Sequence, residues 1–445
     1  MFLEALHDMS NKTTVGELIA AFLEQCGVQT AFGVISIHNM PILDAIHNRG
    51  KIRYVGARGE AGAVNMADGL ARVSGGLGVA FTSTGTAAGN AAGAMVEALT
   101  AGTALLHITG QIETEYLDKD LAYIHEAPDQ LSMLQSISKA AFRVRSVETA
   151  LPTIREAVRV AQTAPSGPVS VEIPIDIQAA EIDWPADLAA PHVTTLTHSS
   201  ARVAQLAEQL ASAKRPLLWL GGGTRHARAA VERLVALGFG VVTSVQGRGV
   251  LPEDHPATLG AFNVHAAVES FYKTCDALVV VGSRLRGNET LKYKLALPQP
   301  LYRIDADALA DNRGYRNDMF VHGDAAAVLE ELATLLEGRL KIDPTFAQDL
   351  AAARESAVAD VGKGLGPYKR LVDALQKAVG RDYNWVRDVT ISNSTWGNRM
   401  LKIFSPRAGV HALGGGIGQG MQMGIGAALA GNAAKTVCLV GDLMR

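Results

Sequence analysis

Short apolar runs alternate with helical stretches over the first 180 residues, and this alternation limits the fold more than any other feature. The runs Thr30–Gly33 and Val79–Thr82 read as strands, and Gly167–Pro174 is the last of the series. The stretches Val15–Cys26 and Pro41–Asn48 have the composition of helices. Short apolar strands between helices indicate a parallel, doubly wound sheet with helices on both faces. We therefore expect an α/β protein.

The same rhythm continues beyond two changes of composition. Glu181–Ser200 contains Pro185 and Pro191 and marks the clearest boundary, and we interpret the charged stretch Lys341–Pro367 as a second linker. A chain of 445 residues is too long for one core. We predict three doubly wound parallel-sheet domains at residues 10–180, 200–340 and 366–445. The third contains too few elements to be complete.

The net charge and the apolar segments of the chain argue against a nucleic-acid partner and a membrane partner. The net charge is −3 and no Lys/Arg block is present, so a nucleic-acid partner has no electrostatic basis. The N-terminus lacks a basic region before an apolar core, so no signal peptide is expected. Ala87–Gly110 is long and apolar, but its Gly, Ala and Thr content favours a buried helix and a strand over a membrane span. We expect no membrane partner.

The three cysteines indicate a reducing compartment. Cys26, Cys275 and Cys438 are far apart in sequence and lie in apolar contexts. Neither disulfide nor metal-ligand spacing is present. We expect buried, reduced thiols in a cytoplasmic protein.

A single carboxylate opens the small, apolar segment Arg58–Arg72. Glu60 follows the strand-like run Ile52–Val55 and precedes a helix rich in Ala, Gly and Met. If water is excluded there, the neutral carboxyl is favoured and its pKa rises, which suits a residue that passes a proton. The alternative is an acid that stabilises the helix dipole from the first turn.

Several motifs in the usual order favour the first role. Arg58–Arg72 stands after Val28–Gly33 and before Gly78–Gly85 and Ile108–Gln111. Together they resemble thiamine-diphosphate enzymes of the acetolactate synthase and 2-keto acid decarboxylase group, over nearly the whole chain. The resemblance implies a pyrimidine-binding domain, a central nucleotide-binding-like (Rossmann-like) domain and a partial diphosphate-binding domain. It also implies thiamine diphosphate and Mg²⁺ as cofactors.

The resemblance assigns cofactor-binding roles to particular residues. It implies that Glu60 hydrogen-bonds the aminopyrimidine ring and helps to remove the thiazolium C2 proton. Met421 matches the bulky apolar residue that holds the two rings in a bent conformation, although a core methionine is the alternative. The other cofactor-binding candidates are Gly85, Asn90, Gly418, Gly420 and Gly441.

The metal signature of the family is only partly present. It consists of a Gly-Asp-Gly turn followed further along by paired asparagines, whose oxygens suit Mg²⁺. Here Gly441 and Asp442 match the start, but Leu443 replaces the second glycine and the sequence ends at Arg445. The resemblance therefore implies Asp442 as the first metal ligand. The alternative is an acid near a chain end.

Three residues are substrate-side catalytic candidates beside Glu60. His38 follows Phe32-Gly33, and benzaldehyde-lyase-like members carry a histidine at the comparable place, where a neutral imidazole can exchange protons. His125 stands where synthases usually have a glutamine, and Gln111 follows Gly110. The alternative for His38 is to cap the helix that follows it. The alternative for Gln111 is that its amide only hydrogen-bonds backbone groups at the end of a strand.

The implied reaction is decarboxylation of a 2-keto acid such as pyruvate, with carboligation to a second carbonyl, as in acetolactate synthases. A simple decarboxylase or a benzaldehyde-lyase-like carboligase or lyase is the alternative. A noncatalytic binding or regulatory subunit is an alternative of another class. The resemblance also implies a homodimer or homotetramer, because the glutamate of one subunit meets cofactor held by another. The sequence fixes neither the donor nor the acceptor.

The central domain leaves its ligand open. Gly221–Gly223 and Gly282–Arg284 match two regions that contact flavin in acetolactate synthases. Leu285–Asn288 and Gly260–Phe262 depart from that pattern. FAD, ADP or no nucleotide all remain open, and the glycine turn has the alternative of packing a strand against a helix.

Overall fold

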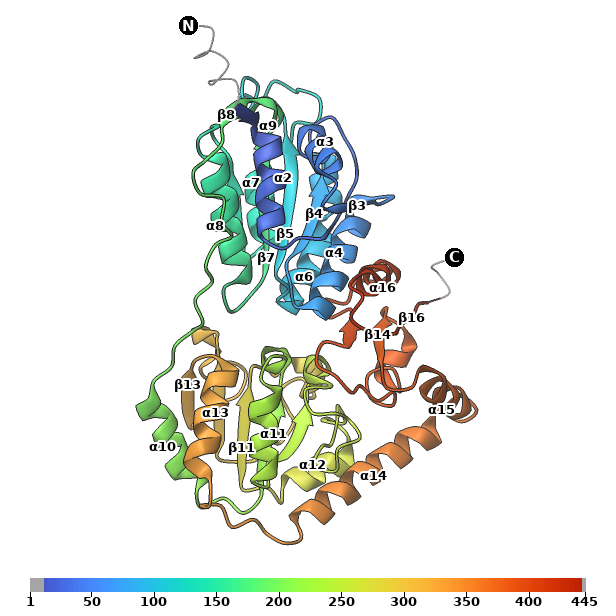
Figure 1. Ribbon diagram of the computed structural model, residues 1–445. Coiled ribbons are helices and arrows are strands. Elements are labelled where there is room, and N and C mark those ends of the chain that lie inside the picture. The colour runs from blue at the N-terminus through green and yellow to red at the C-terminus, as the bar shows by residue number, and fades with distance from the viewer. Residues whose placement is uncertain (1–11, 442–445) are drawn as a thin grey trace, which may run out of the picture. The chain divides into compact units, whose positions relative to one another are not determined.

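The computed structural model describes residues 12–441, which form two compact units. The first unit contains residues 12–194, 412–432 and 438–441, so the chain leaves it and later returns. The second unit contains residues 195–411 and 433–437. Figure 1 shows an α/β arrangement of parallel sheets and helices in each unit.

The first unit is built on a six-stranded parallel sheet in the order β3-β2-β4-β5-β7-β6. A separate antiparallel pair joins β1 to β8. The predicted strand over Thr30–Gly33 is confirmed, and the last strand of the series begins one residue later than predicted. The strands are β1 (Lys12–Thr14), β2 (Thr30–Gly33), β3 (Arg53–Gly56), β4 (Gly78–Thr82), β5 (Leu105–Gln111), β6 (Ala140–Arg143), β7 (Pro168–Pro174) and β8 (Glu181–Asp183).

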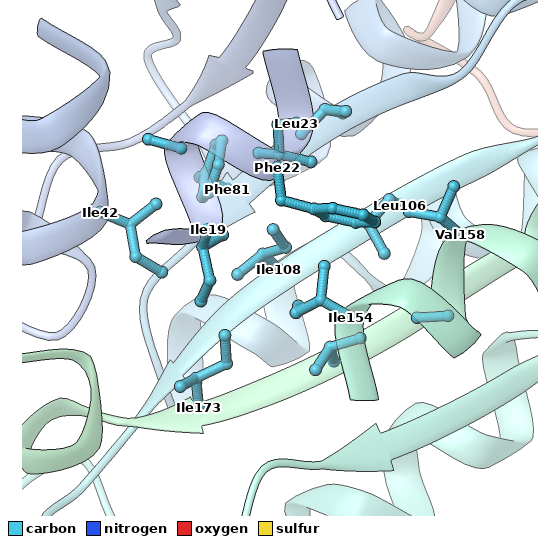
Figure 2. Close-up of a cluster of buried hydrophobic side chains, with 14 of the residues drawn as sticks. Ile19, Phe22, Leu23, Ile42, Phe81, Leu106, Ile108, Ile154, Val158 and Ile173 are labelled. Atoms are coloured by element: carbon cyan, nitrogen blue, oxygen red, sulfur yellow. The ribbon is translucent and has the colours of Figure 1, made fainter. Parts of the chain in front are cut away.

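Helices cover both faces of this sheet, because successive side chains of its strands point to opposite faces. On one face, helices α2, α3 and α8 pack on Phe81, Leu106 and Ile108, as Figure 2 shows. On the other, α4, α6 and α7 pack on Phe32, Ala80 and Leu105. The helices are α2 (Val15–Gln25), α3 (Met40–Arg49), α4 (Glu60–Ser74), α5 (Thr86–Asn90), α6 (Ala92–Ala101), α7 (Gln130–Ile137), α8 (Ala150–Gln162) and α9 (Ile175–Ala179).

The second unit has a five-stranded parallel sheet in the order β10-β9-β11-β12-β13. Helices α10, α11 and α13 cover one face, and α12 and α14 cover the other. Its elements are α10 (Ser200–Leu210), β9 (Pro216–Leu220), α11 (Arg228–Ala236), β10 (Gly240–Thr243), α12 (Ala266–Tyr272), β11 (Ala277–Val281), β12 (Leu301–Asp305), β13 (Met319–His322), α13 (Ala325–Leu336), α14 (Phe346–Gly364) and α15 (Tyr368–Val379), with short 3₁₀ turns at Gly222–Thr224, Val245–Gly247, Gly287–Glu289 and Ala308–Ala310.

A three-stranded sheet in the order β15-β14-β16 completes the described chain. Strand β14 (Tyr383–Arg387) runs parallel to β15 (Gly409–His411), and a 3₁₀ turn at Ile391–Ser394 lies between them. Helix α16 (Gly420–Leu429) belongs to the first unit, and β16 (Lys435–Leu439) contributes residues to both units.

Two expectations from the sequence are wrong. Lys341–Pro367 is not a linker, because α14 fills most of it and buries Phe346, Leu350 and Ala357 in the core of the second unit. The cysteines are not all buried: Cys275 is, Cys26 is partly exposed and Cys438 is exposed. Within residues 12–441, none of the three cysteines forms a disulfide bond.

The apolar segment Ala87–Gly110 is confirmed as helix followed by strand, because it forms α5, α6 and most of β5. Within residues 12–441, no helix combines the length and the apolar character needed to cross a membrane.

Candidate functional site

Glu60 is the first residue of α4, directly after the turn that leaves β3. The residue before it, Gly59, has an extended backbone and provides no side-chain cap. The Glu60 carboxylate is partly exposed rather than enclosed, and Asn90 Nδ2 donates to its Oε2 at 3.2 Å. Asn90 ends α5, so two helices bring this pair together. The position also suits the helix dipole, so both roles considered for Glu60 are compatible with it.

Helix α16 packs closely against α4 because glycines let the two backbones approach. A Cβ atom at Gly69 would overlap the carbonyl of Met423, and one at Gly426 would overlap the carbonyl of Met66. Near the start of both helices, a Cβ at Gly62 would lie 3.6 Å from Cγ of Gln422. The predicted cofactor-binding residues of α16 therefore lie near the Glu60 end of α4.

The turn that enters α16 carries the other glycines predicted to bind cofactor. Gly418 has a φ of +88°, which favours glycine, and Gly420 is the buried first residue of α16. Cys438 Sγ donates to the Gly420 carbonyl at 3.1 Å. Met421 follows and is 42% exposed, so it is not an ordinary core methionine.

A buried acid fixes the loop ahead of that turn. Glu97 in α6 is 1% exposed, and its carboxylate accepts the backbone N–H groups of Leu413 at 2.7 Å and Gly414 at 2.5 Å. It also pairs with Arg72 at 2.9 Å, and Arg72 pairs with Asp68 at 2.6 Å. Glu97 thus connects α4 to the glycine-rich loop.

Gly85 adopts a backbone conformation that a side chain would obstruct. Its φ is +61°, and a Cβ there would overlap the carbonyl oxygen of His125. Its N–H donates to Oε1 of Gln130 at 2.7 Å. Gly85 therefore allows residues 113–126, the loop after β5, to lie against the start of α5.

Gln111 lies in a buried polar network rather than at an open surface. It is 1% exposed, its Oε1 accepts from Thr84 Oγ1 at 3.0 Å, and its Nε2 donates to Glu172 at 3.3 Å. Gln130 Nε2 donates to the same carboxylate at 2.8 Å. Arg143 pairs with the other oxygen of Glu172. Gln111 makes its hydrogen bonds within this network and can therefore position the neighbouring turn.

The two candidate histidines lie together. The rings of His38 and His125 meet edge to face with centroids 5.0 Å apart. His38 is 3% exposed and its Nδ1 has no hydrogen-bond partner, whereas His125 is exposed. No side chain caps α3, so His38 does not have the capping role considered above. Burial, and then the neighbouring His125, lower the pKa of His38, so its imidazole is neutral at pH 7.

Two of the predicted residues lie at the end of the described chain or beyond it. Gly441 is the last residue described, and Asp442 lies outside the described residues. No group of three His, Cys, Asp or Glu side chains in the described part of the chain could hold a metal ion. In the second unit, a Cβ at Gly221 would overlap Gly282, so that glycine turn packs two strand ends together.

Sequence reasoning missed the residues that hold the site in place. Glu97, Gln130 and Glu172 each make several buried hydrogen bonds. A signal existed for two of them, since Glu97 and Glu172 are isolated charges in otherwise apolar segments. An isolated charge in a buried segment requires partners.

Two family models match this chain. Residues 13–133 match the thiamine pyrophosphate enzyme N-terminal TPP-binding domain, and residues 203–332 match the thiamine pyrophosphate enzyme central domain. These ranges cover the two larger parallel sheets except the last strands of the first.

Relatives align along almost the whole chain. A protein named probable 2-ketoarginine decarboxylase from Pseudomonas aeruginosa is 32% identical over 96% of this chain and 77% of its own length. A probable acetolactate synthase large subunit from Methanocaldococcus jannaschii is 28% identical, with coverages of 96% and 75%. Acetolactate synthase isozyme 1 large subunit from Escherichia coli is 28% identical, with coverages of 96% and 77%.

Proposed function

Because the chain belongs to the thiamine pyrophosphate enzyme family, we propose that it decarboxylates a 2-keto acid and joins the remaining acyl group to a second carbonyl. The chain is a thiamine-diphosphate-dependent enzyme of the kind to which the acetolactate synthase relatives belong. With two pyruvates as the reference substrates, one C–C bond breaks to release CO₂. The electron pair of the broken bond forms the new C–C bond, and a proton is taken up at the oxygen of the acceptor carbonyl.

The residues present fit the aminopyrimidine end of the cofactor. Glu60 is partly exposed at a helix start, and a Cβ built on the adjacent Gly59 would meet no atom within 4 Å. The space is thus open beside Gly59, and Asn90 holds the Glu60 carboxylate. When bound, thiamine diphosphate supplies the electron sink for loss of CO₂. The Glu60–Asn90 pair, at the start of helix α4, whose Gly62 lies beside Gln422 of α16, is the observation on which the proposal rests.

Each site residue has a proposed role. Glu60 holds and moves a proton at the aminopyrimidine ring, and Asn90 fixes its orientation. Met421, with Gly418 and Gly420, supports the cofactor rings, and Gly85 shapes the loop that carries His125. His38 and His125 hold or transfer a proton at the keto acid. Gln111 positions the end of β5.

Mg²⁺, oligomeric state and location are further parts of the proposal. Asp442 and Gly441 would hold the metal and the diphosphate, since carboxylate and backbone oxygens suit Mg²⁺. We propose a homodimer or homotetramer in the cytoplasm. The free cysteines are compatible with that compartment.

A simple decarboxylase is the second candidate. In that reaction a proton, rather than a second carbonyl, captures the electron pair after CO₂ leaves. His38 and His125 lie edge to face and could relay a proton to the substrate, and one relative is named as a decarboxylase. Product analysis with pyruvate separates the two, since acetolactate indicates carboligation and acetaldehyde indicates decarboxylation alone.

Glu60→Gln tests the central assignment. We expect exchange of the C2 proton of bound cofactor, followed by NMR, to slow by roughly 10²–10⁴-fold, because the amide cannot move the proton. Calorimetric titration with thiamine diphosphate and Mg²⁺ should still show binding. Glu17→Gln is the matched control, since Glu17 also lies in the first turn of a helix, α2. Unchanged exchange in Glu60→Gln would remove Glu60 from its role.

A further inference from the structure

The loop after β5 is strongly acidic. Residues 113–126 contain five carboxylates and one lysine. Three of the carboxylates have partners, since Asp118 pairs with Arg143 at 2.6 Å, Glu126 accepts the N–H of Tyr123 at 3.0 Å, and the Tyr123 side chain hydrogen-bonds Glu113. This loop therefore favours cationic groups near the candidate histidines. The five are Glu113, Glu115, Asp118, Asp120 and Glu126.

Glu113 is the carboxylate best placed to receive a ligand. Its side chain is partly buried, and its Oε2 is shielded from water without a hydrogen-bond partner. The residues beside it are fixed: the Ile112 N–H donates to Gln111 at 2.9 Å and the Thr114 N–H donates to Asp176 at 3.1 Å. A shielded, unpaired carboxylate oxygen is unfavourable, and a cation that pairs with it removes the cost.

Two aromatic rings accompany this carboxylate. Tyr116 and Tyr123 stack with centroids 4.4 Å apart and an interplanar angle of 16°. Desolvation, and then the charge of Glu113, raise the pKa of Tyr123, which indicates that Tyr123 lies close to Glu113. Aromatic faces attract cations, and guanidinium groups stack on them. Glu113, Tyr116 and Tyr123 form what we call the loop triad.

The loop triad adjoins the substrate side of the proposed site. The charge of Glu113 acts on His38 and partly opposes the lowering of its pKa. His38 is 3% exposed and has an Nδ1 without a partner, which is a second buried polar atom that a ligand can satisfy. One ligand with a carbonyl end and a cationic end could engage both.

We propose that the loop triad recognises a cationic group at the end of the side chain of the 2-keto acid. This inference rests on the proposed function, because it names the substrate class of the same site. A guanidinium fits best, since it donates two parallel N–H bonds to a carboxylate and stacks on tyrosine. Glu113 is thus a specificity-determining residue, and neutral keto acids such as pyruvate lack the group that it binds.

A matched pair of ligands tests the inference by binding. A 2-keto acid that ends in a guanidino group is compared by calorimetry with its neutral analogue that ends in urea, on protein without added cofactor. We expect the guanidino acid to bind roughly 10- to 100-fold more tightly, as for hydrogen bonds to charged groups. Glu113→Gln should abolish this preference, and Glu113→Asp should retain part of it. Glu115→Gln, at an exposed acid of the same loop, is the control and should keep it.

Release of CO₂ from each keto acid, measured with cofactor present, is a separate readout. Equal or undetectable affinities for the two ligands overturn the inference, as does a preference that survives Glu113→Gln. Charge-selective binding without CO₂ from any keto acid supports the inference and overturns the proposed function. Release of CO₂ from pyruvate, together with equal binding of the two ligands, supports the proposed function and overturns the inference.

Discussion

At the scale of single residues, buried charges govern how the first unit holds its glycine-rich loop. Asp68, Arg72 and Glu97 are all at least 98% buried, and Thr103 also donates to Asp68 at 2.6 Å. Every carboxylate in the group accepts hydrogen bonds from Arg72, and Glu97 adds two backbone donors. Removal of one member leaves buried polar groups of the others without that partner, which costs far more than the loss of an exposed pair.

Replacing Glu97 with alanine should therefore destabilise the protein strongly. Arg72 would lose a carboxylate partner, and the N–H groups of Leu413 and Gly414 would lose their acceptor. We expect the free energy of unfolding in urea to fall by about 3–5 kcal/mol. Glu156→Ala is the control, because the Glu156–Arg159 pair is exposed and contributes little. Similar losses in both variants would contradict this account.

His107 makes stability depend on pH. Its ring lies between Thr82 Oγ1 at 2.9 Å and Ser170 Oγ at 3.0 Å, and it is fully buried in β5. Burial lowers the pKa of His107 from 6.5 to about 4. Between these values the unfolded chain binds a proton that the folded chain does not, so the free energy of unfolding falls as the pH is lowered from 6.5 towards 4.

This contribution can be isolated with His107→Gln. For the unsubstituted protein, we expect His107 to remove about 2 kcal/mol of stability between pH 7 and pH 5. The variant should lose this part of the pH dependence, whatever its stability at pH 7. Urea unfolding of both proteins at the two pH values measures the difference. An identical pH dependence would show that His107 is not kept neutral by burial.

At the scale of elements, the crossing of α4 and α16 depends on glycine. A Cβ at Gly426 would overlap the carbonyl of Met66 and lie 2.9 Å from the nitrogen of Leu70. Both neighbours are backbone atoms, which cannot move away as a flexible side chain can. The close approach places the start of α16 near Glu60 and so supports the proposed site.

Gly426→Ala should force the two helices apart. We expect a loss of about 1–3 kcal/mol in the free energy of unfolding, as for other overpacked sites. Gly62→Ala is the matched control on α4, because its nearest neighbour is the flexible Gln422 side chain at 3.6 Å. It should change stability by no more than about 1 kcal/mol. A neutral Gly426→Ala variant would mean that the helices are not in close contact.

The same scale shows what the sequence can and cannot predict. Strands such as Thr30–Gly33 and Gly78–Thr82 were predictable because they are short apolar runs bounded by turn residues. Helix α14 was missed because its apolar residues are diluted by charge, and only packing on the second sheet reveals its buried face. The polar network of Gln111, Gln130 and Glu172 joins residues far apart in sequence, so local patterns do not reveal it.

At the scale of the whole molecule, exposed apolar side chains favour association. In the first unit Val96 on α6 and Ile425 on α16 are each 43% exposed, and Ile417 is 72% exposed. Water contact with such side chains is unfavourable, and a second copy that covers them would remove the cost. Ile417 precedes Gly418 and Ile425 lies on α16, so an assembled state would also cover part of the proposed cofactor-binding segment.

We therefore expect light scattering to give at least twice the chain mass of 46.9 kDa at micromolar concentration. Ile425→Glu should shift the protein towards the monomer, because a charge cannot be buried there without a partner. Circular dichroism at the same concentration controls for folding of the variant. A monomer at every concentration of the unsubstituted protein would rule out the proposed assembly.

The return of the chain to its first unit has a consequence for biosynthesis. Residues 75–419 separate α4 from α16, so the ribosome releases α4 long before its partner helix exists. During that interval the glycine-bearing face of α4 is uncovered, and pairing at such long sequence separation is slow. The nascent protein thus passes through a stage at which α4 has been synthesised but its glycine-bearing face is still exposed. Holding chaperones could recognise that face.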